Sequence, residues 1–231
     1  MDMRLLVVLL AVLAAAQEKQ PTPVDPGGSG HAPSDAVVLF DGTNLNHWAT
    51  AKGEPAKCTV ANAELACKSG AGDIYSREKF RDAQLHVEFF IPLMADQKGQ
   101  MRGNSGVYIH ARYEMQVLDS YNNPTYANGS IGALYGQYAP LVNAARPPEQ
   151  WQTYDIIFHA PRCESDGKVT RPGTVTALLN GVLVQDHVEI IKVPKECGDN
   201  EGPLMLQDHS GFPGAPVTVM KFRNIWFRRL Q

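Results

Sequence analysis

Short stretches of β-branched and aromatic residues recur from residue 36 to the C-terminus, and Gly, Pro, Asn or Asp bounds each of them. This pattern is typical of β-strands separated by turns. The strongest hairpin signal is Asn180-Gly181, between TVTALLN and VLVQDHV. Beyond the N-terminal apolar run, no segment carries a long apolar stripe with the period of a helix. We therefore expect an all-β sandwich with little helix. The other expected strands are 36–40, 85–91, 105–111, 113–119, 154–160, 203–209 and 217–230.

The N-terminus, MDMRLLVVLLAVLAAAQEKQ, places one Arg before an apolar run and three alanines before Gln17. This is the pattern of a secretory signal peptide, residues 1–16, which we expect to be cleaved after Ala16. The apolar run is shorter than the roughly 20 residues that cross a bilayer, so a membrane anchor is the weaker interpretation. We expect a secreted or periplasmic protein that has no membrane contact after cleavage.

Residues 17–34 are rich in Pro and Gly and have almost no large apolar side chain. Such a segment cannot bury enough surface to offset the entropy lost on ordering, so we interpret it as a flexible leader. Residues 35–231 are enough chain for one domain with its own core. The formal net charge of −3 and the scattered Lys and Arg provide no basic stripe, so nucleic acid is not an expected partner. The sequence leaves the oligomeric state open.

Four cysteines in an exported chain favour two disulfides, for which three pairings exist. In CTVANAELAC, a central turn would bring two short strands side by side, which favours Cys58 with Cys67. Cys163 and Cys197 would then pair by elimination, since each lies just beyond an apolar strand. A metal site is the alternative, but the chain has no CxxC spacing and an oxidising compartment argues against it.

Residues 103–121, GNSGVYIHARYEMQVLDSY, alternate like strands and yet carry Asn, His, Glu, Gln and Asp. With a period of two, Tyr108 and His110 share one face of the first strand. Glu114 and Gln116 share one face of the next. These side chains could converge on one patch, or they could lie on the solvated face of an antiparallel sheet. The variety of hydrogen-bonding and titratable groups favours a site, because a merely solvated face is usually rich in Lys, Thr and Ser.

Six motifs follow one another in a fixed order along the chain. They are LFDGTNLNHW (39–48), GNSGVYIH with YEMQVLDSY, GALYG (132–136), EQWQTYDI (149–156), LNGVLVQD (179–186), and GPLMLQDHSG followed by VTVMKFRNIWFRRL. Together they resemble the 3-keto-disaccharide hydrolase domain family over essentially all of residues 37–230. The chain departs from what is usual in that family at His110 and at Gln150-Trp151-Gln152, which affects substrate detail more than membership.

The resemblance implies a concanavalin A-like jelly roll, in which the concave face of two antiparallel sheets binds carbohydrate. It also implies an exported enzyme that acts on glycosides whose ring carries a ketone at carbon 3. The ketone acidifies the hydrogen on carbon 2, because the carbanion left by its removal is delocalised as an enolate. The glycosidic bond at carbon 1 is β to that carbanion, so a base can expel the aglycone by elimination. Later addition of water gives net hydrolysis.

Such a reaction needs a general base, a group that stabilises the enolate oxygen, and an acid for the leaving oxygen. Glu114 is our candidate for one acid/base role, because partial burial on an apolar strand would raise its pKa. Its structural alternative is an ion pair with Arg102, Arg112 or Arg223. His209 in LQDHSG is the candidate for the other role, since imidazole titrates near neutral pH; its alternative is a hydrogen bond to a loop carbonyl.

Other polar residues are expected to bind the sugar. They are Asn104, His110, Gln116, Asp119, Tyr135, Gln207 and Arg223. The sequence requires no cofactor. It does contain residue types that bind divalent metals, and such a metal could polarise the ketone, but their spacing matches no metal motif. Those ligand types belong to His110, Glu114, Asp119, Asp208 and His209.

A non-catalytic, lectin-like carbohydrate-binding module is the main alternative function, since the same fold serves lectins and amide and aromatic side chains also describe a sugar-binding face. Titratable groups distinguish the two, because a lectin does not need both Glu114 and His209. Ordinary glycoside hydrolysis needs two carboxylates that flank the bond, and no E-x-D-x-E strand occurs. An adaptor role would not require the polar strand pair.

Overall fold

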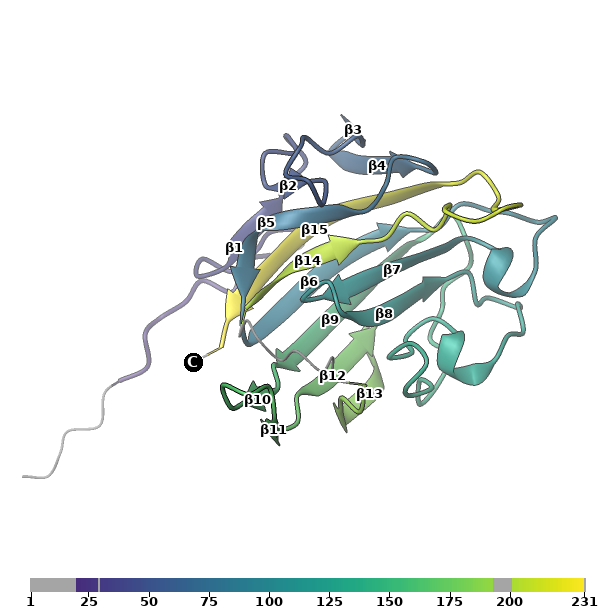
Figure 1. The fold of residues 1–231 in the computed structure, drawn as a ribbon. Coiled ribbons are helices and arrows are strands. Elements are labelled where there is room, and N and C mark those ends of the chain that lie inside the picture. The colour runs from purple at the N-terminus through teal and green to yellow at the C-terminus, as the bar shows by residue number, and fades with distance from the viewer. Residues whose placement is uncertain (1–19, 29, 193–200, 231) are drawn as a thin grey trace, which may run out of the picture.

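The structure is a computed structural model that describes residues 20–28, 30–192 and 201–230. Two antiparallel sheets pack face to face (Figure 1). The eight-stranded sheet contains β1 (Val37–Phe40), β3 (Thr59–Ala61), β4 (Glu64–Lys68), β6 (Ala83–Phe90), β9 (Trp151–His159), β12 (Thr174–Leu179), β13 (Val182–Glu189) and β15 (Val219–Arg229). The five-stranded sheet contains β2 (Trp48–Ala49), β5 (Ile74–Phe80), β7 (Asn104–Ile109), β8 (Tyr113–Leu118) and β14 (Gly202–Leu206). Shorter elements are β10 (Arg162–Cys163), β11 (Val169–Arg171) and the 3-10 helices η1 (Gly99–Met101) and η2 (Ala127–Gly129).

Within each sheet, hairpin pairs alternate with strands that are far apart in the sequence. The larger sheet runs β13-β12-β9-β6-β15-β4-β3, with β1 also paired to β15, and the smaller sheet runs β2-β5-β14-β7-β8. Only β7 and β8 are joined by a tight turn within the smaller sheet, whereas β14 reaches β7 across about half of the domain. This is the jelly-roll β-sandwich that the strand pattern and the family resemblance predict.

The core lies between the sheets and follows from alternation along each strand. On β6, Leu85, Val87 and Phe89 are completely buried, while the residues between them face outward. Ile109 on β7 and Met115 on β8 enter the core from the smaller sheet. Burying one such side chain stabilises the fold by about 1.5–3 kcal/mol, so a shift of register by one residue would be very costly. The outward faces are therefore fixed.

Two turns confirm the local signals of the sequence. Asn180 and Gly181 both have positive φ values, 54° and 80°, and join β12 to β13 as an Asn-Gly hairpin. Asn62 and Ala63, with φ values of 54° and 58°, form the turn between β3 and β4.

The strand β5 is not among the expected strands. Its sequence IYSREKF is mostly polar, and the partners β2 and β14 hold it in the sheet.

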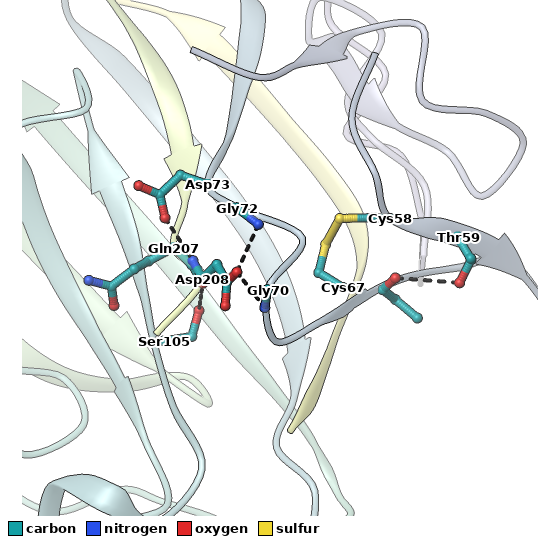
Figure 2. The surroundings of a disulfide bond; sticks show 10 residues. Cys58, Thr59, Cys67, Gly70, Gly72, Asp73, Ser105, Gln207 and Asp208 are labelled. Carbon is teal, nitrogen blue, oxygen red and sulfur yellow. Dashed lines mark hydrogen bonds between the residues drawn. A yellow bond between two sulfur atoms is a disulfide. The ribbon is translucent and has the colours of Figure 1, made fainter. Parts of the chain in front are cut away.

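A disulfide joins Cys58, just before β3, to Cys67 in β4, which confirms the first expected pair (Figure 2). None of the cysteines in the described part of the chain is free. The second expected pair includes Cys197, which lies outside the described residues, so its bond to Cys163 stays a prediction.

The expected signal peptide, residues 1–16, also lies outside the described residues, as does the start of the leader. Later in the leader, the Ser34 amide donates to the Asp25 carbonyl at 3.0 Å, and the Asp25 amide donates to Ser34 Oγ at 3.1 Å. Asp35 then forms a two-pronged ion pair with Arg228 on β15, with both contacts at 2.7 Å. These contacts attach the end of the leader to the larger sheet. Within residues 20–28, 30–192 and 201–230, no helix is long and apolar enough to cross a membrane.

Candidate active site

A row of hydrogen bonds crosses three adjacent strands on the outward face of the smaller sheet. The Tyr108 hydroxyl on β7 donates to Glu114 Oε2 on β8 at 2.7 Å. Gln207, directly after β14, donates from Nε2 to the same hydroxyl at 3.1 Å. Tyr108 and Glu114 are direct partners in the β7–β8 register, so the backbone pairing itself brings them together. We refer to these three residues as the Glu114 row.

The Glu114 carboxylate is poised to exchange a proton near neutral pH. Burial raises the pKa of Glu114 from 4.5 to about 7, and the hydrogen bond from Tyr108 opposes part of that rise. Burial and the neighbouring carboxylate raise the pKa of Tyr108, which keeps the phenol protonated and able to donate. Glu114 Oε1 makes no hydrogen bond within the described part of the chain and is not sealed from solvent. It is therefore the oxygen that can meet a ligand.

Two half-exposed tyrosines lie beside the Glu114 row. The Tyr126 and Tyr135 hydroxyls are 2.5 Å apart, and their ring centroids are 6.2 Å apart in an edge-on arrangement. The Tyr135 amide donates to the Glu114 carbonyl at 2.9 Å, so this loop runs along β8. Burial, the bond to Tyr135 and the charge of Glu114 together raise the pKa of Tyr126 to about 12. The pair thus offers amphipathic ring surface within electrostatic range of the carboxylate.

Asn104 and Gln116, both expected to bind sugar, face the same side but are buried under loops. Asn104 Nδ2 donates to the Gln100 carbonyl at 2.8 Å. Gln116 Nε2 donates to Gln100 Oε1 at 3.1 Å and to the Gly129 carbonyl at 3.2 Å. Their amides hold η1 and η2 against the sheet, so these residues shape the loops that border the site.

The segment after β14 is anchored by Asp208. Its Oδ2 accepts hydrogen bonds from the Gly70 amide at 2.8 Å and the Gly72 amide at 2.7 Å. Its own amide donates to Asp73 Oδ1 at 2.8 Å. Figure 2 shows the Asp208 carboxylate directed toward Gly70 and Gly72, while the Gln207 side chain points the other way. The loop that follows the disulfide hairpin therefore fixes where Gln207 meets Tyr108.

His209 follows this anchor and is half-buried, with its ring packed edge-on against Phe212 at 5.1 Å between centroids. Burial lowers the pKa of its imidazole, because desolvation disfavours the charged ring. No contact within the described residues joins His209 to the Glu114 row. Its proton-transfer role stays a prediction.

His110 lies in the core rather than beside Tyr108. It follows the end of β7 with a positive φ of 57°, which breaks the alternation and turns the side chain inward. Its Nε2 donates to the Arg81 carbonyl at 3.0 Å, and its ring lies 4.8 Å from Phe158 and 5.2 Å from Phe80. Burial lowers the pKa of His110 to about 4. The structure therefore corrects the expectation that His110 shares the face of Tyr108.

Asp119 and Arg223 are each occupied by an ion pair away from Glu114. Asp119 is buried and contacts Arg102 Nε at 2.7 Å. Arg223 lies on the outward face of the larger sheet, where it contacts Glu88 Oε2 at 2.6 Å. Its guanidinium also stacks over Trp151 at 4.1 Å from the ring centroid. The expectation that Arg223 joins the other polar candidates is therefore wrong, because the two outward faces point away from each other.

The residues that carry metal-ligand chemistry do not form a cluster. In the described ranges, no group of three or more His, Cys, Asp or Glu side chains is placed to hold a metal ion. His110 is in the core, and Asp119 and Asp208 are engaged by Arg102 and by backbone amides. We therefore derive no step through a metal.

Tyr108 and Tyr126 also contribute to the site, beyond the residues expected to bind the sugar or to transfer protons. The short turn between β7 and β8 could have revealed Tyr108, because it sets the register that pairs this residue with Glu114. Tyr126 carries no such signal, since it reaches Tyr135 through the path of a loop.

Comparisons with known proteins place the chain among carbohydrate-acting proteins. Residues 35–228 match the 3-keto-alpha-glucoside-1,2-lyase-like domain. A crystal structure of a presumed glycosyl hydrolase from Parabacteroides distasonis shares 41% identity with a TM-score of 0.86, over 94% of this chain and 95% of that one. A second presumed glycosyl hydrolase from the same organism shares 18% identity with a TM-score of 0.61, over 85% and 94% of the two chains. Alginate lyase Aly36B shares 11% identity with a TM-score of 0.50, over 85% and 98%. These last two show the fold alone. No curated protein matches the chain.

Proposed function

The chain belongs to the 3-keto-alpha-glucoside-1,2-lyase-like domain family, and from this premise and the Glu114 row we propose that it is an exported carbohydrate-active enzyme that cleaves the glycosidic bond of 3-keto-glycosides. The proposed route is base-assisted elimination followed by addition of water. The observation that carries the proposal is Glu114, a carboxylate with a pKa of about 7 and one unpaired oxygen on the outward face of the sheet.

Glu114 acts as the base. Its Oε1 removes the proton from carbon 2, and the electron pair of that bond moves into the enolate formed with the ketone. The bond from carbon 1 to the leaving oxygen then breaks, which gives an unsaturated keto sugar and the free aglycone. Water adds to the unsaturated sugar to complete hydrolysis. A base with a pKa near the working pH is the most effective kind, because it is ionised and still holds a proton well.

The half-exposed rings of Tyr126 and Tyr135 support a sugar as the ligand. Such rings present an apolar face for the C–H groups of a sugar and a hydroxyl for hydrogen bonds. The tyrosine pair lies next to the backbone of Glu114, so a ring stacked there would lie near the base. The same surface would also serve a binding module without catalysis, which makes turnover the deciding measurement.

The test uses the purified mature protein, a 3-keto-disaccharide and the same disaccharide without the ketone, in heavy water. Mass spectrometry follows the released sugar and the deuterium at carbon 2, with and without a chelator. We expect release and exchange from the keto substrate alone. The Glu114→Gln variant should lose both by about 10²–10⁴-fold. A matched control is Glu64→Gln, which removes a carboxylate paired with Lys221 on the larger sheet.

Three outcomes would contradict the proposal. Equal release from the disaccharide without a ketone would indicate ordinary hydrolysis. Saturable sugar binding without release would indicate a lectin-like module. Full activity of a folded Glu114→Gln variant would remove this residue from the mechanism.

A further inference from the structure

The hydrogen bonds of the Glu114 row have a defined direction. A phenol has one proton, and Tyr108 donates it to Glu114 Oε2, while Gln207 Nε2 donates to the phenol oxygen. The backbone N–H of Gln207 donates to the Gly106 carbonyl at 3.0 Å, which fixes Gln207 beside β7. Tyr108 is thus held with its proton on the side of the carboxylate, and its oxygen is supported by a second donor.

The side chains of Tyr108 and Glu114 both lie directly over Gly106. A Cβ atom at this position would lie 2.7 Å from Glu114 Oε1 and 2.6 Å from Cε2 of the Tyr108 ring. The backbone of Gly106 does not require glycine, because its φ lies outside the left-handed region. Glycine is therefore needed here to make room for the neighbouring side chains, and not to allow a particular backbone conformation. Glycine at this position lets the carboxylate and the phenol lie close together over the backbone of β7, where a side chain would displace both.

From this juxtaposition we propose that Tyr108 is a catalytic residue, the acid that protonates the leaving glycosidic oxygen. The inference rests on the proposed function and adds the identity of the acid. Carbons 1 and 2 are bonded neighbours, so one hydrogen-bonded acid–base pair can serve both the proton on carbon 2 and the oxygen on carbon 1.

The proton balance closes without another reactant. Glu114 Oε1 takes the proton from carbon 2, and the enolate forms. The carbon 1–oxygen bond breaks as carbons 1 and 2 become doubly bonded and the ketone reforms. The leaving oxygen takes the phenolic proton of Tyr108, and the resulting phenolate takes the proton now held by Glu114. Both side chains return to their starting states, and the proton has moved from carbon 2 to the aglycone.

The charges favour this order of events. The negative charge of Glu114 is one cause of the raised pKa of Tyr108. That charge disappears once Glu114 has taken the proton from carbon 2. The phenol therefore becomes a stronger acid at the point when the leaving oxygen needs a proton. Gln207 Nε2, which donates to the phenol oxygen, would stabilise the transient phenolate.

The experiment compares leaving groups in Tyr108→Phe, using 3-keto-glucosides of p-nitrophenol and of a simple alcohol. Nitrophenolate leaves without a proton, whereas an alkoxide does not. We expect the variant to keep carbon 2 exchange and nitrophenol release within about tenfold of wild type and to lose release of the alcohol by about 10²-fold or more. Rates are compared on the high-pH plateau of each protein, so that Glu114 is ionised in both and a shift of its pKa does not affect the comparison.

Two variants serve as comparisons. Tyr113→Phe removes the same hydroxyl from the residue beside Glu114, but Tyr113 faces the core, so both leaving groups should react at the wild-type rate. His209→Ala tests the competing acid. On our proposal the ratio of alcohol to nitrophenol release stays the same in this variant, even if both rates change. Circular dichroism and melting temperature show that each variant is folded.

The inference is overturned if Tyr108→Phe slows exchange and both releases equally, which would make Tyr108 a positioning residue for Glu114. It is also overturned if the loss specific to the alcohol appears in His209→Ala instead. Both results require an active wild-type protein. A wild type with neither exchange nor release on any 3-keto-glycoside would refute the proposed function itself, so the two failures are distinguishable.

Discussion

Removing the Tyr108 hydroxyl should move the pH dependence of the reaction to higher pH. The base must be ionised to accept the proton from carbon 2, so turnover of the wild type should rise as pH increases through the pKa of Glu114, about 7. The Tyr108 hydrogen bond at 2.7 Å stabilises the ionised carboxylate and therefore lowers this pKa. Tyr108→Phe keeps the ring and most of the burial but removes that stabilisation.

The size of the shift follows from the strength of the bond. A hydrogen bond to a charged group contributes about 1.5–3 kcal/mol. One pKa unit corresponds to about 1.4 kcal/mol of difference between the two protonation states. The Glu114 pKa in Tyr108→Phe should therefore rise by about 1–2 units, because burial still favours the neutral form and less opposes it.

The assay is carbon 2 exchange in heavy water, measured as kcat/KM across the pH range, because exchange reports the base and needs no acid for the leaving group. Wild type should show an acid limb near pH 7, and Tyr108→Phe should show the same limb shifted upward with a similar plateau. Tyr113→Phe should leave the limb in place, since its hydroxyl lies on the core side of β8. An unmoved or downward-shifted limb in Tyr108→Phe would refute the argument that this phenol stabilises the Glu114 carboxylate.

Three further predictions concern the stability of the fold and the packing around Glu114. Folding raises the pKa of Glu114 from 4.5 to about 7, so the native state binds this proton more tightly than the unfolded state and loses stability as the pH rises across that window. Glu114→Gln should therefore be more stable than the wild type at pH 8, by up to about 3 kcal/mol in urea unfolding. Equal stabilities of the two proteins would contradict this. Gly106→Ala should lower turnover by about tenfold or more with little loss of melting temperature, because the added Cβ would displace Glu114 and Tyr108. Gly28→Ala is the control: no atom lies within 4 Å of its added Cβ, so turnover should not change. Replacing Cys58 and Cys67 together by Ser should lower the free energy of unfolding by about 3 kcal/mol on the chain-entropy view, and a change below 0.5 kcal/mol would show that the hairpin is held by its packing instead.

The fold was predictable because its signals are local. The Asn180-Gly181 turn, the Cys58–Cys67 hairpin and the alternation on β6 each depend on residues close in sequence, and each is confirmed. The β5 strand was not predicted, because its polar residues carry little β propensity and its place is decided by the partners β2 and β14.

The candidate site was predicted in part. Glu114 stands on the expected face, since alternation along β8 places it there. The same reasoning failed for His110, because a positive φ at the end of β7 interrupts the period of two. It also failed for Arg223, because alternation indicates that a side chain faces outward but does not indicate which sheet its strand joins.

The sequence by itself determined most of the strands, the turns at Asn180-Gly181 and within the Cys58–Cys67 hairpin, and the side of each regular strand that enters the core, because these follow from the period of the backbone and from the cost of exposing apolar surface. Only the tertiary structure decided which outward-facing residues meet. Gln207 contacts Tyr108 because β14 pairs with β7, about a hundred residues away in the chain, and Arg223 is separated from Glu114 because its strand belongs to the opposite sheet. Such meetings depend on the order in which strands pair, a property of the whole domain that no local pattern records.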